Sequence, residues 1–208
     1  MASAAVAGGI LVGRWLARSA RGNAAPPPVD PATAKSGTPP VAPPKPPVGT
    51  DLLAEFPCQL GDVIIAASGE EAWLAGALVF SERLPTAALF VAPEAGGDRA
   101  LFVRPRPSPS LTWLAPIPGG ELLVGPEPPS SLEHKGDRFE RTRRVPLSVK
   151  RIGTGAPDCG DQAILAEYAT AAGARMVIVV AGTFSRAWRG DLLGEGTFDI
   201  LPSGKSTL

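Results

Sequence analysis

The stretch AILAEYATAAGARMVIVVAG, residues 163–182, decides which fold class the chain adopts. Its first half is rich in Ala, Leu and Glu, which favour a helix. The residues Ala171-Ala172-Gly173-Ala174, however, lie between two apolar runs and are typical of a hairpin turn. The residues of this stretch alone leave two interpretations open: residues 162–173 form a helix, or they belong to a hairpin of two strands.

The rest of the chain from residue 51 onward favours β structure. Its apolar segments are short, rich in Val, Ile, Leu and Phe, and separated by Gly or Pro roughly every eight to twelve residues. This spacing is typical of an all-β sandwich or barrel. We therefore predict one compact, mostly antiparallel β domain over residues 51–202, with Trp73 and Trp113 substantially buried. The predicted strands are 62–66, 73–81, 87–92, 100–104, 111–115, 121–124, 138–143, 146–152, 162–170, 175–181 and 197–201.

Two Gly-Asp steps, at Gly61-Asp62 and Gly136-Asp137, each precede a predicted strand and suggest two related β modules. They belong to a longer series of motifs within residues 56–202. The series is LGDVIIAASGEEAWLAGALVF, LFVAP, LTWLAPI, GDRFERTRRVPLSVKRIGTGAP, AILAEYATAAGARMVIVVAG and FDILP. It resembles a bacterial domain-of-unknown-function family of small β proteins. In that family a Leu-x-Gly-Asp opening, an early strand tryptophan, a Trp-Leu pair and a second Gly-Asp module recur in this order.

The family resemblance implies a β fold, and with it the hairpin interpretation of residues 162–181. It also implies a setting among membrane-associated or envelope-stress genes. It brings no catalytic residues to this chain.

Residues 1–22 contain an apolar run, ASAAVAGGILVGRWLA at residues 2–17, which Ser3 and Arg14 interrupt. A bilayer-spanning helix needs about 17 to 25 residues, so this run spans only if Arg14 snorkels to a headgroup. The basic residues follow the apolar run, which favours a single-pass inner-membrane anchor with the β domain in the cytoplasm. The alternative is a surface-lying or disordered N-terminus on a soluble cytoplasmic protein.

Residues 23–50 are predicted to form a disordered, Pro-rich linker, because ten of the 24 prolines lie within residues 26–47. Residues 203–208 are predicted to be a flexible tail. Residues 1–50 carry five basic residues and one acidic residue, a net charge of +4. Because the whole chain has no net charge, residues 51–208 carry −4. The β domain is therefore acidic.

The sequence assigns no catalytic, cofactor-binding or metal-binding residue. The terminal Gly204-Lys205-Ser206 is not a phosphate-binding loop, because Asp199 replaces the first glycine of the motif and no helix can follow. The pairs Gly153-x-Gly155 and Gly194-x-Gly196 are interpreted as turns, since Asp158 and Asp199 replace the third glycine of a dinucleotide motif.

Two cysteines and one histidine are too few for a structural zinc site within one chain. We predict that Cys58 and Cys159 are reduced. Cys159 lies between Asp158 and Asp161, whose carboxylates disfavour a thiolate, so a catalytic role is disfavoured.

A basic run along residues 138–151 (Arg138, Arg141, Arg143, Arg144, Lys150 and Arg151) is interpreted as the solvated face of a half-buried strand. The acidic balance of the domain argues against nucleic-acid binding.

We therefore expect a non-enzymatic, membrane-tethered β module that contacts a protein partner or the membrane surface. No small-molecule ligand and no cofactor are expected. The alternative is a soluble enzyme that uses the loop carboxylates Asp158, Asp161 or Glu167, or the thiol of Cys159.

Overall fold

The computed structural model describes residues 51–93 and 98–203, and every regular element in this part of the chain is a β-strand. Among these residues no helix is long and apolar enough to cross a membrane. The proposed anchor and linker, and all of the proposed tail except Ser203, lie outside the described residues. The strands are β1 (Val63–Ala66), β2 (Glu71–Trp73), β3 (Gly76–Ser81), β4 (Pro85–Ala92), β5 (Arg99–Arg104), β6 (Ser110–Pro116), β7 (Ser131–His134), β8 (Asp137–Gly153), β9 (Gln162–Ala169), β10 (Arg175–Ala181), β11 (Phe184–Leu193) and β12 (Phe198–Leu201).

The stretch that decides the fold class forms a hairpin, so the helix interpretation of residues 162–173 is wrong. Strands β9 and β10 pair antiparallel, and Gly173 has a φ of +97°, a backbone conformation that glycine adopts without strain. The turn is closed because Thr170 N–H donates to Ala174 O at 3.0 Å and its Oγ1 accepts from Ala174 N–H at 3.1 Å. Strand β9 is apolar on both faces because one face lines the barrel interior and the other lies under an outer layer. Because both faces of β9 are buried, its amino-acid composition resembles that of a helix.

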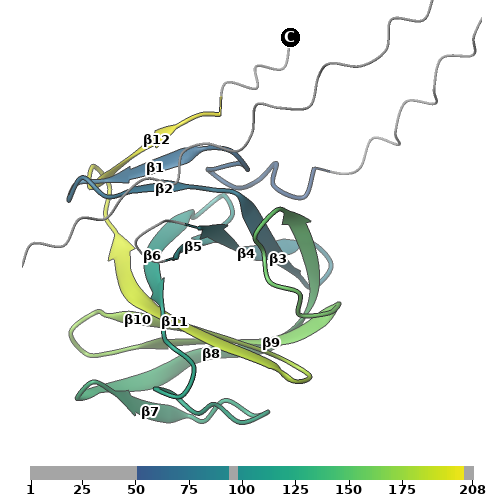
Figure 1. The fold of residues 1–208 in the computed structure, drawn as a ribbon, viewed down its shortest axis with the longest axis vertical. Helices are drawn as coiled ribbons and strands as arrows, with labels where there is room; N and C mark the ends of the chain where they lie inside the picture. Colours follow the sequence, from purple (N-terminus) through teal and green to yellow (C-terminus); the bar gives the residue numbers. More distant parts are fainter. Residues whose placement is uncertain (1–50, 94–97, 204–208) are drawn as a thin grey trace, which may run out of the picture. The chain divides into compact units, whose positions relative to one another are not determined.

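Eight strands close into an antiparallel barrel in the order β3-β4-β5-β6-β11-β10-β9-β8 (Figure 1). The closure is made by β3 and the second half of β8, where Gly76 lies opposite Gly153 and Ser81 opposite Ser148. Closure leaves no free edge in the barrel itself. The predicted all-β fold is therefore confirmed, in its barrel form.

Strand β8 is continuous over 17 residues, so the predicted break between residues 143 and 146 is wrong. Its first part pairs with β7 and its last part with β3, whereas Pro146 lies between these two regions and has a neighbour only in β9. Proline is tolerated at this position because neither β7 nor β3 lies beside it to accept a hydrogen bond from a backbone N–H.

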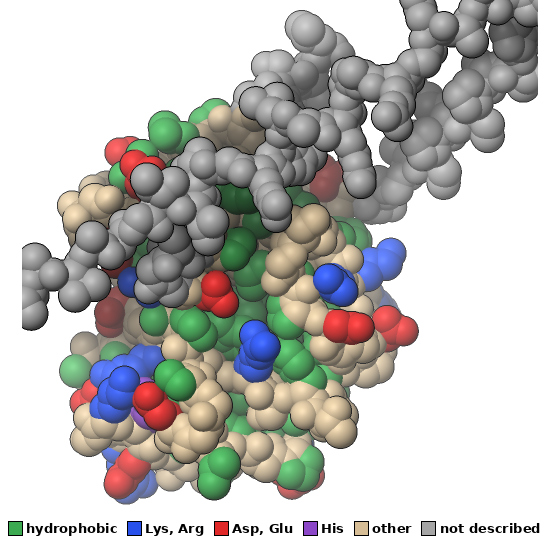
Figure 2. Space-filling model, viewed as in Figure 1, with side chains coloured by type: hydrophobic (Ala, Val, Ile, Leu, Met, Phe, Trp, Pro, Cys, Tyr) green, Lys and Arg blue, Asp and Glu red, His purple; other side chains and the backbone are tan. Residues whose placement is uncertain are grey.

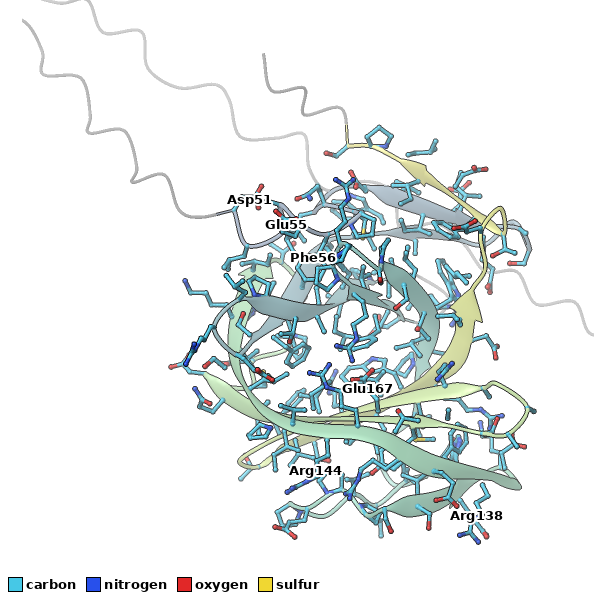
Figure 3. All side chains as sticks on the ribbon, turned by 180° about the vertical axis from the view of Figure 1, so that it is seen from behind. Asp51, Glu55, Phe56, Arg138, Arg144 and Glu167 are labelled. Atoms are coloured by element: carbon cyan, nitrogen blue, oxygen red, sulfur yellow. The ribbon has the colours of Figure 1, made fainter. Side chains whose placement is uncertain are left out.

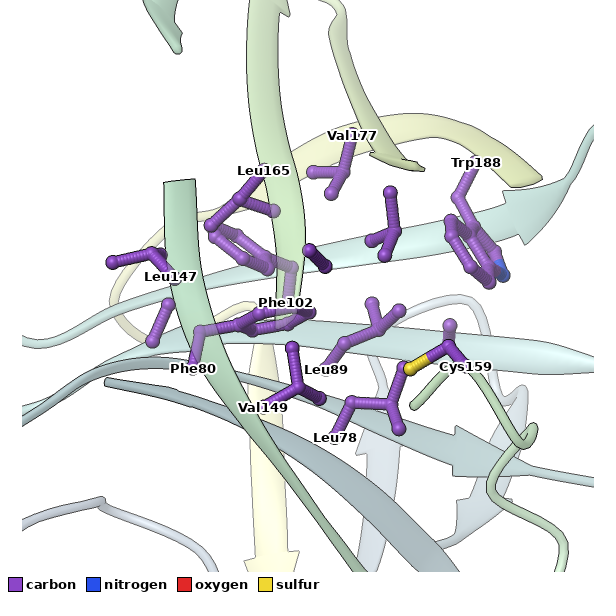
Figure 4. Packing of buried hydrophobic residues seen from close by; sticks show 14 of the residues in the cluster. Leu78, Phe80, Leu89, Phe102, Leu147, Val149, Cys159, Leu165, Val177 and Trp188 are labelled. Atoms are coloured by element: carbon purple, nitrogen blue, oxygen red, sulfur yellow. The ribbon is translucent and has the colours of Figure 1, made fainter. Parts of the chain in front are cut away.

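The barrel interior is filled by apolar side chains that all eight strands and the loop after β8 contribute (Figure 4). Alternate residues of each strand point inward, as the period of a β-strand requires. The largest side chains that fill it are Leu78, Phe80, Leu89, Phe102, Leu114, Leu147, Leu165 and Trp188.

Two further layers cover the outside of the barrel. The small antiparallel sheet β12-β1-β2 and residues 51–60 pack against the outer side of β3, β4, β5 and β6. Strand β7 and the segment of residues 117–124 pack against the outer side of β8, β9, β10 and β11. In this second layer, Tyr168 donates its hydroxyl hydrogen to Pro129 O at 2.8 Å.

Two strands were not predicted from the sequence, namely β7 and β11. Strand β11 contains Arg186, Arg189, Gly190 and Asp191, a composition that hides its period of two. Gly190 is required because a Cβ there would collide with the carbonyl oxygen of Trp113 on β6. The predicted strand at residues 121–124 is wrong, since these residues form a turn and an irregular segment.

The predicted burial of the tryptophans is wrong for Trp73, which is 55% exposed. The sequence was interpreted as one strand from residue 73 to 81, but the chain leaves the small sheet at Leu74 and enters the barrel at Gly76. Trp113 is half-buried in the layer under the small sheet, and Trp188, which the sequence did not single out, is buried in the barrel.

Candidate docking face

The outer face of the small sheet carries a row of apolar side chains that the fold leaves uncovered by described residues. Trp73 on β2 and Leu201 on β12 both lie opposite Val63 on β1, so the three residues form one row across the sheet. Trp73 is 55% exposed, Leu201 is 51% exposed and Val63 is half-buried. An aromatic ring of this size that stays in water is a common feature of interaction surfaces.

A second row on the same face is acidic at both ends. Glu71 on β2 and Asp199 on β12 lie opposite Ile65 on β1 and are exposed, whereas Ile65 is half-buried. We call the two rows together the docking face: Trp73, Val63 and Leu201 in the first row, and Glu71, Ile65 and Asp199 in the second.

The opposite face of the small sheet fixes it to the barrel. Ile64 is fully buried and lies opposite both Ala72 and Ile200, and these side chains join the layer that covers β3 to β6. Alternation along the strands then forces the neighbouring residues outward. The exposure of Trp73 and Leu201 therefore follows from strand register.

Asp62 fixes one end of the small sheet, where the start of β1 lies beside the end of β12. It is only 5% exposed, and its carboxylate accepts hydrogen bonds from Gln59 N–H at 2.7 Å and from Ser203 N–H at 3.0 Å. Ser203 lies two residues after the end of β12, so one carboxylate links the start of β1 to the segment that follows β12. The first Gly-Asp step therefore fixes the small sheet. In the second, Gly136 forms the turn between β7 and β8 together with Lys135, and Asp137 begins β8.

One end of the barrel carries inward-facing charges. Glu167 lies inside the ring of strands (Figure 3), and its side chain accepts a hydrogen bond from Arg104. Arg104 also donates to Thr86 O at 3.2 Å and lies over the ring of Phe102 at 5.5 Å. Both partners of the ion pair are about four-fifths buried, with side-chain exposures of 21% and 18%. The pair closes this end of the core with a satisfied polar contact.

The candidate carboxylates of the enzyme hypothesis do not come together. Glu167 is at the C-terminal end of β9, whereas Asp158 and Asp161 lie in the loop that precedes β9. In that loop Cys159 is 8% exposed and belongs to the barrel core. Burial raises the pKa of the Cys159 thiol, Asp158 and Asp161 raise it further, and Arg151 lowers it. Such a thiol is a poor nucleophile at neutral pH.

The second cysteine, Cys58, is also buried, and it forms no disulfide with Cys159. Burial, and secondarily the carboxylate of Asp62, raise the pKa of Cys58 from 9.0 to about 12. Within the described residues no group of three or more His, Cys, Asp or Glu side chains is placed to hold a metal ion.

The basic run is spread over both faces of β8, and three of its six residues, Arg138, Arg143 and Arg144, lie near acidic side chains. Arg138 pairs with Glu140 at 2.7 Å, and Arg144 approaches Glu127 at 3.8 Å. Figure 3 shows Arg138 and Arg144 outside the ring of barrel strands. In Figure 2 the basic and acidic side chains on the visible face are interspersed. The prediction that this run lies on a half-buried strand is confirmed, but the run does not form one solvated face, because Arg141 and Arg143 are half-buried.

The glycine pairs are turns, as predicted. Gly153 and Gly155, with φ of +70° and +81°, lie where β8 ends. Gly194 accepts a hydrogen bond from Thr197 N–H at 3.1 Å in the turn that leads into β12. In the terminal Gly-Lys-Ser motif, Asp199 belongs to β12, and the motif itself lies outside the described residues.

His134, the single histidine, is 6% exposed, and its Nε2 lies 3.4 Å from Oε2 of Glu121. This contact links β7 to the segment of residues 117–124 that covers the second side of the barrel.

Comparison with known proteins found no match to this chain among protein-family models, curated proteins or solved structures.

Proposed function

We propose that residues 51–202 form a non-enzymatic docking module that binds a protein partner through the docking face. Residues 1–22 tether the module to the inner membrane, and the β domain lies in the cytoplasm. The resemblance to a family of small bacterial β proteins in membrane-associated settings agrees with this proposal.

The observation that carries the proposal is the exposure of Trp73 in a row with Val63 and Leu201. Tryptophan is the residue most enriched among those that dominate binding energy at protein interfaces. Here the ring stands on a sheet whose other face is packed on the barrel, so little ordering is needed when a partner binds.

The charges around the row favour a protein partner over an anionic membrane surface. Glu71 and Asp199 flank the row, and residues 51–208 carry a net charge of −4. Anionic headgroups would be repelled by these carboxylates, whereas a protein segment with Lys or Arg beside apolar side chains would be attracted.

Site-specific photocrosslinking in cells tests the docking function. A photoreactive phenylalanine analogue in place of Trp73 should yield one discrete adduct with a partner, and the added substitution Leu201→Ser should reduce that adduct. The same analogue at Leu123, which is 92% exposed in the segment between β6 and β7, is the matched control and should yield no such adduct. Equal adducts from both positions would contradict the proposal.

Fractionation tests the tether separately. Deletion of residues 1–22 should move the protein from the membrane fraction to the soluble fraction while the β domain stays folded, because the Pro-rich linker uncouples the two parts. A full-length chain that is already in the soluble fraction after gentle lysis would refute the tether but not the docking face.

A further inference from the structure

The small sheet ends on one side in β12, and the backbone of this strand offers unused pairing capacity. Within the described part of the chain, β12 pairs with β1 and with no other strand. Sheet edges of this kind are the sites at which extended segments of other proteins add by backbone hydrogen bonds.

The direction of the free backbone groups follows from the observed pairing. Ala67 N–H donates to Thr197 O at 2.8 Å, so the carbonyl group of Thr197 points toward β1. Because groups alternate along an antiparallel strand, those of Asp199 and Leu201 also point toward β1. The N–H and C=O groups of Phe198 and Ile200 then point toward the open edge.

Two side chains of the same strand, those of Asp199 and Leu201, belong to the docking face, whereas Phe198 and Ile200 pack toward the barrel. Leu201 ends the apolar row and Asp199 ends the acidic row, both at the open edge. Any strand that pairs with β12 therefore places alternate side chains next to Leu201 and Asp199, at the spacing of directly opposed residues.

We propose that β12 accepts one antiparallel strand from the partner, and that this strand carries an apolar residue followed two positions later by Lys or Arg. The apolar side chain lies beside Leu201 and extends the apolar row, and the basic side chain lies opposite Asp199. The residue between them lies beside Ile200, whose backbone exchanges hydrogen bonds with it. This inference rests on the proposed function, since it names the kind of segment that the docking face binds.

A second copy of the chain fits this edge less well than a basic segment does. Pairing of two β12 strands would bring a second Asp199 to the interface, and neither copy supplies a basic residue from this strand. Pro202 follows the strand directly and cannot donate a ladder hydrogen bond, so pairing is confined to about four residues. A short motif with a strict order of side chains is therefore the expected ligand.

The test uses the full 208-residue chain and a synthetic peptide, Ser-Thr-Leu-Val-Lys-Thr-Ser, followed by amide NMR. On binding, the amide protons of Phe198 and Ile200 should gain protection from exchange, and those of Asp199 and Leu201 should change little. Replacement of the peptide Lys by Glu should weaken binding about threefold. In the protein variant Asp199→Lys, the peptide with Glu should bind more tightly than the peptide with Lys.

N-methylation of the peptide backbone provides the matched control for strand addition. An N-methyl group on Val, whose N–H faces Ile200, should weaken binding about fivefold or more, because it removes one hydrogen bond. The same group on Leu, whose N–H points away from β12, should leave the affinity unchanged. Equal effects of the two N-methyl groups would overturn the strand-addition proposal.

The outcomes separate this inference from the proposed function. If Leu201→Ser weakens peptide binding while N-methylation of Val does not, the docking face stands and the added strand is refuted. If the peptide binds without any dependence on Leu201 or Asp199, both are refuted. Concentration-dependent dimerisation that protects Phe198 and Ile200 without peptide would show that a second copy occupies the edge, and would also refute the proposal.

Discussion

Replacement of Trp188 by alanine should destabilise the β domain far more than replacement of Trp73. Trp188 is 4% exposed and packs in the barrel interior, whereas Trp73 is 55% exposed on the docking face. The same chemical change is therefore made once in the core and once at the surface of one chain. The difference tests whether the barrel interior is the main source of stability.

The expected size of the effect follows from the buried area. A fully buried tryptophan side chain removes about 200 Å² from water, which at about 25 cal/mol per Å² is worth about 5 kcal/mol. Replacement of a buried aromatic side chain by alanine typically costs about 3 to 5 kcal/mol, so we expect Trp188→Ala to lower the free energy of unfolding by about this amount. Trp73→Ala opens no cavity, because less than half of the Trp73 side chain is buried. We therefore expect this substitution to lower the free energy of unfolding by about 1 kcal/mol or less.

Urea denaturation followed by circular dichroism, with full-length variants, measures both values. Trp188→Phe, which keeps an aromatic ring in the core, is the control and should lose less stability than Trp188→Ala. Losses of equal size for Trp188→Ala and Trp73→Ala would refute the assignment of Trp188 to the core and of Trp73 to the surface.

Three further predictions concern other contacts of the domain. Gly190→Ala should cost more than about 3 kcal/mol in unfolding free energy or prevent folding, because its Cβ would collide with the carbonyl oxygen of Trp113; a neutral result in urea denaturation would contradict the strand register. Cys58 should resist iodoacetamide between pH 7 and 9 in the native state, because the pKa of its thiol is raised from 9.0 to about 12. For the same reason the stability that the neutral thiol contributes should be complete below pH 9 and should be lost as the pH rises toward 12. Arg104→Met should cost about 1 to 3 kcal/mol, and Glu167→Gln should cost less in that variant than in the native chain; additive losses in the double variant would show that the two side chains are not coupled.

The sequence predicts the strands best where composition and period agree. In β4, β5, β9 and β10 the apolar residues are continuous enough to stand out, and each strand was located to within about two residues. Strand β11 was missed because three of its ten residues, Arg186, Arg189 and Asp191, are charged and one is a glycine. Its place between β6 and β10 is set by pairing on both sides, which a single sequence does not show.

The docking face could not be predicted because it depends on which strands become neighbours. Val63, Trp73 and Leu201 are separated by up to 138 positions, and each is an ordinary strand residue in its own segment. The prediction that Trp73 is buried failed because residues 73–81 were interpreted as one strand. The bend at Leu74 and Ala75, which turns the chain from the small sheet into the barrel, carries no glycine or proline of its own to mark it.

Side-chain labelling by hydroxyl radicals, compared between the purified chain and the protein in intact cells, measures most directly whether a partner covers the docking face. Trp73 and Leu201 should be labelled strongly in the purified chain and much less in cells, where the partner covers the docking face. Leu123, exposed on the segment between β6 and β7, serves as the internal reference and should be labelled equally in both states. If the labelling of Trp73 relative to Leu123 is the same in cells and in the purified chain, the docking face is not occupied and the account is contradicted.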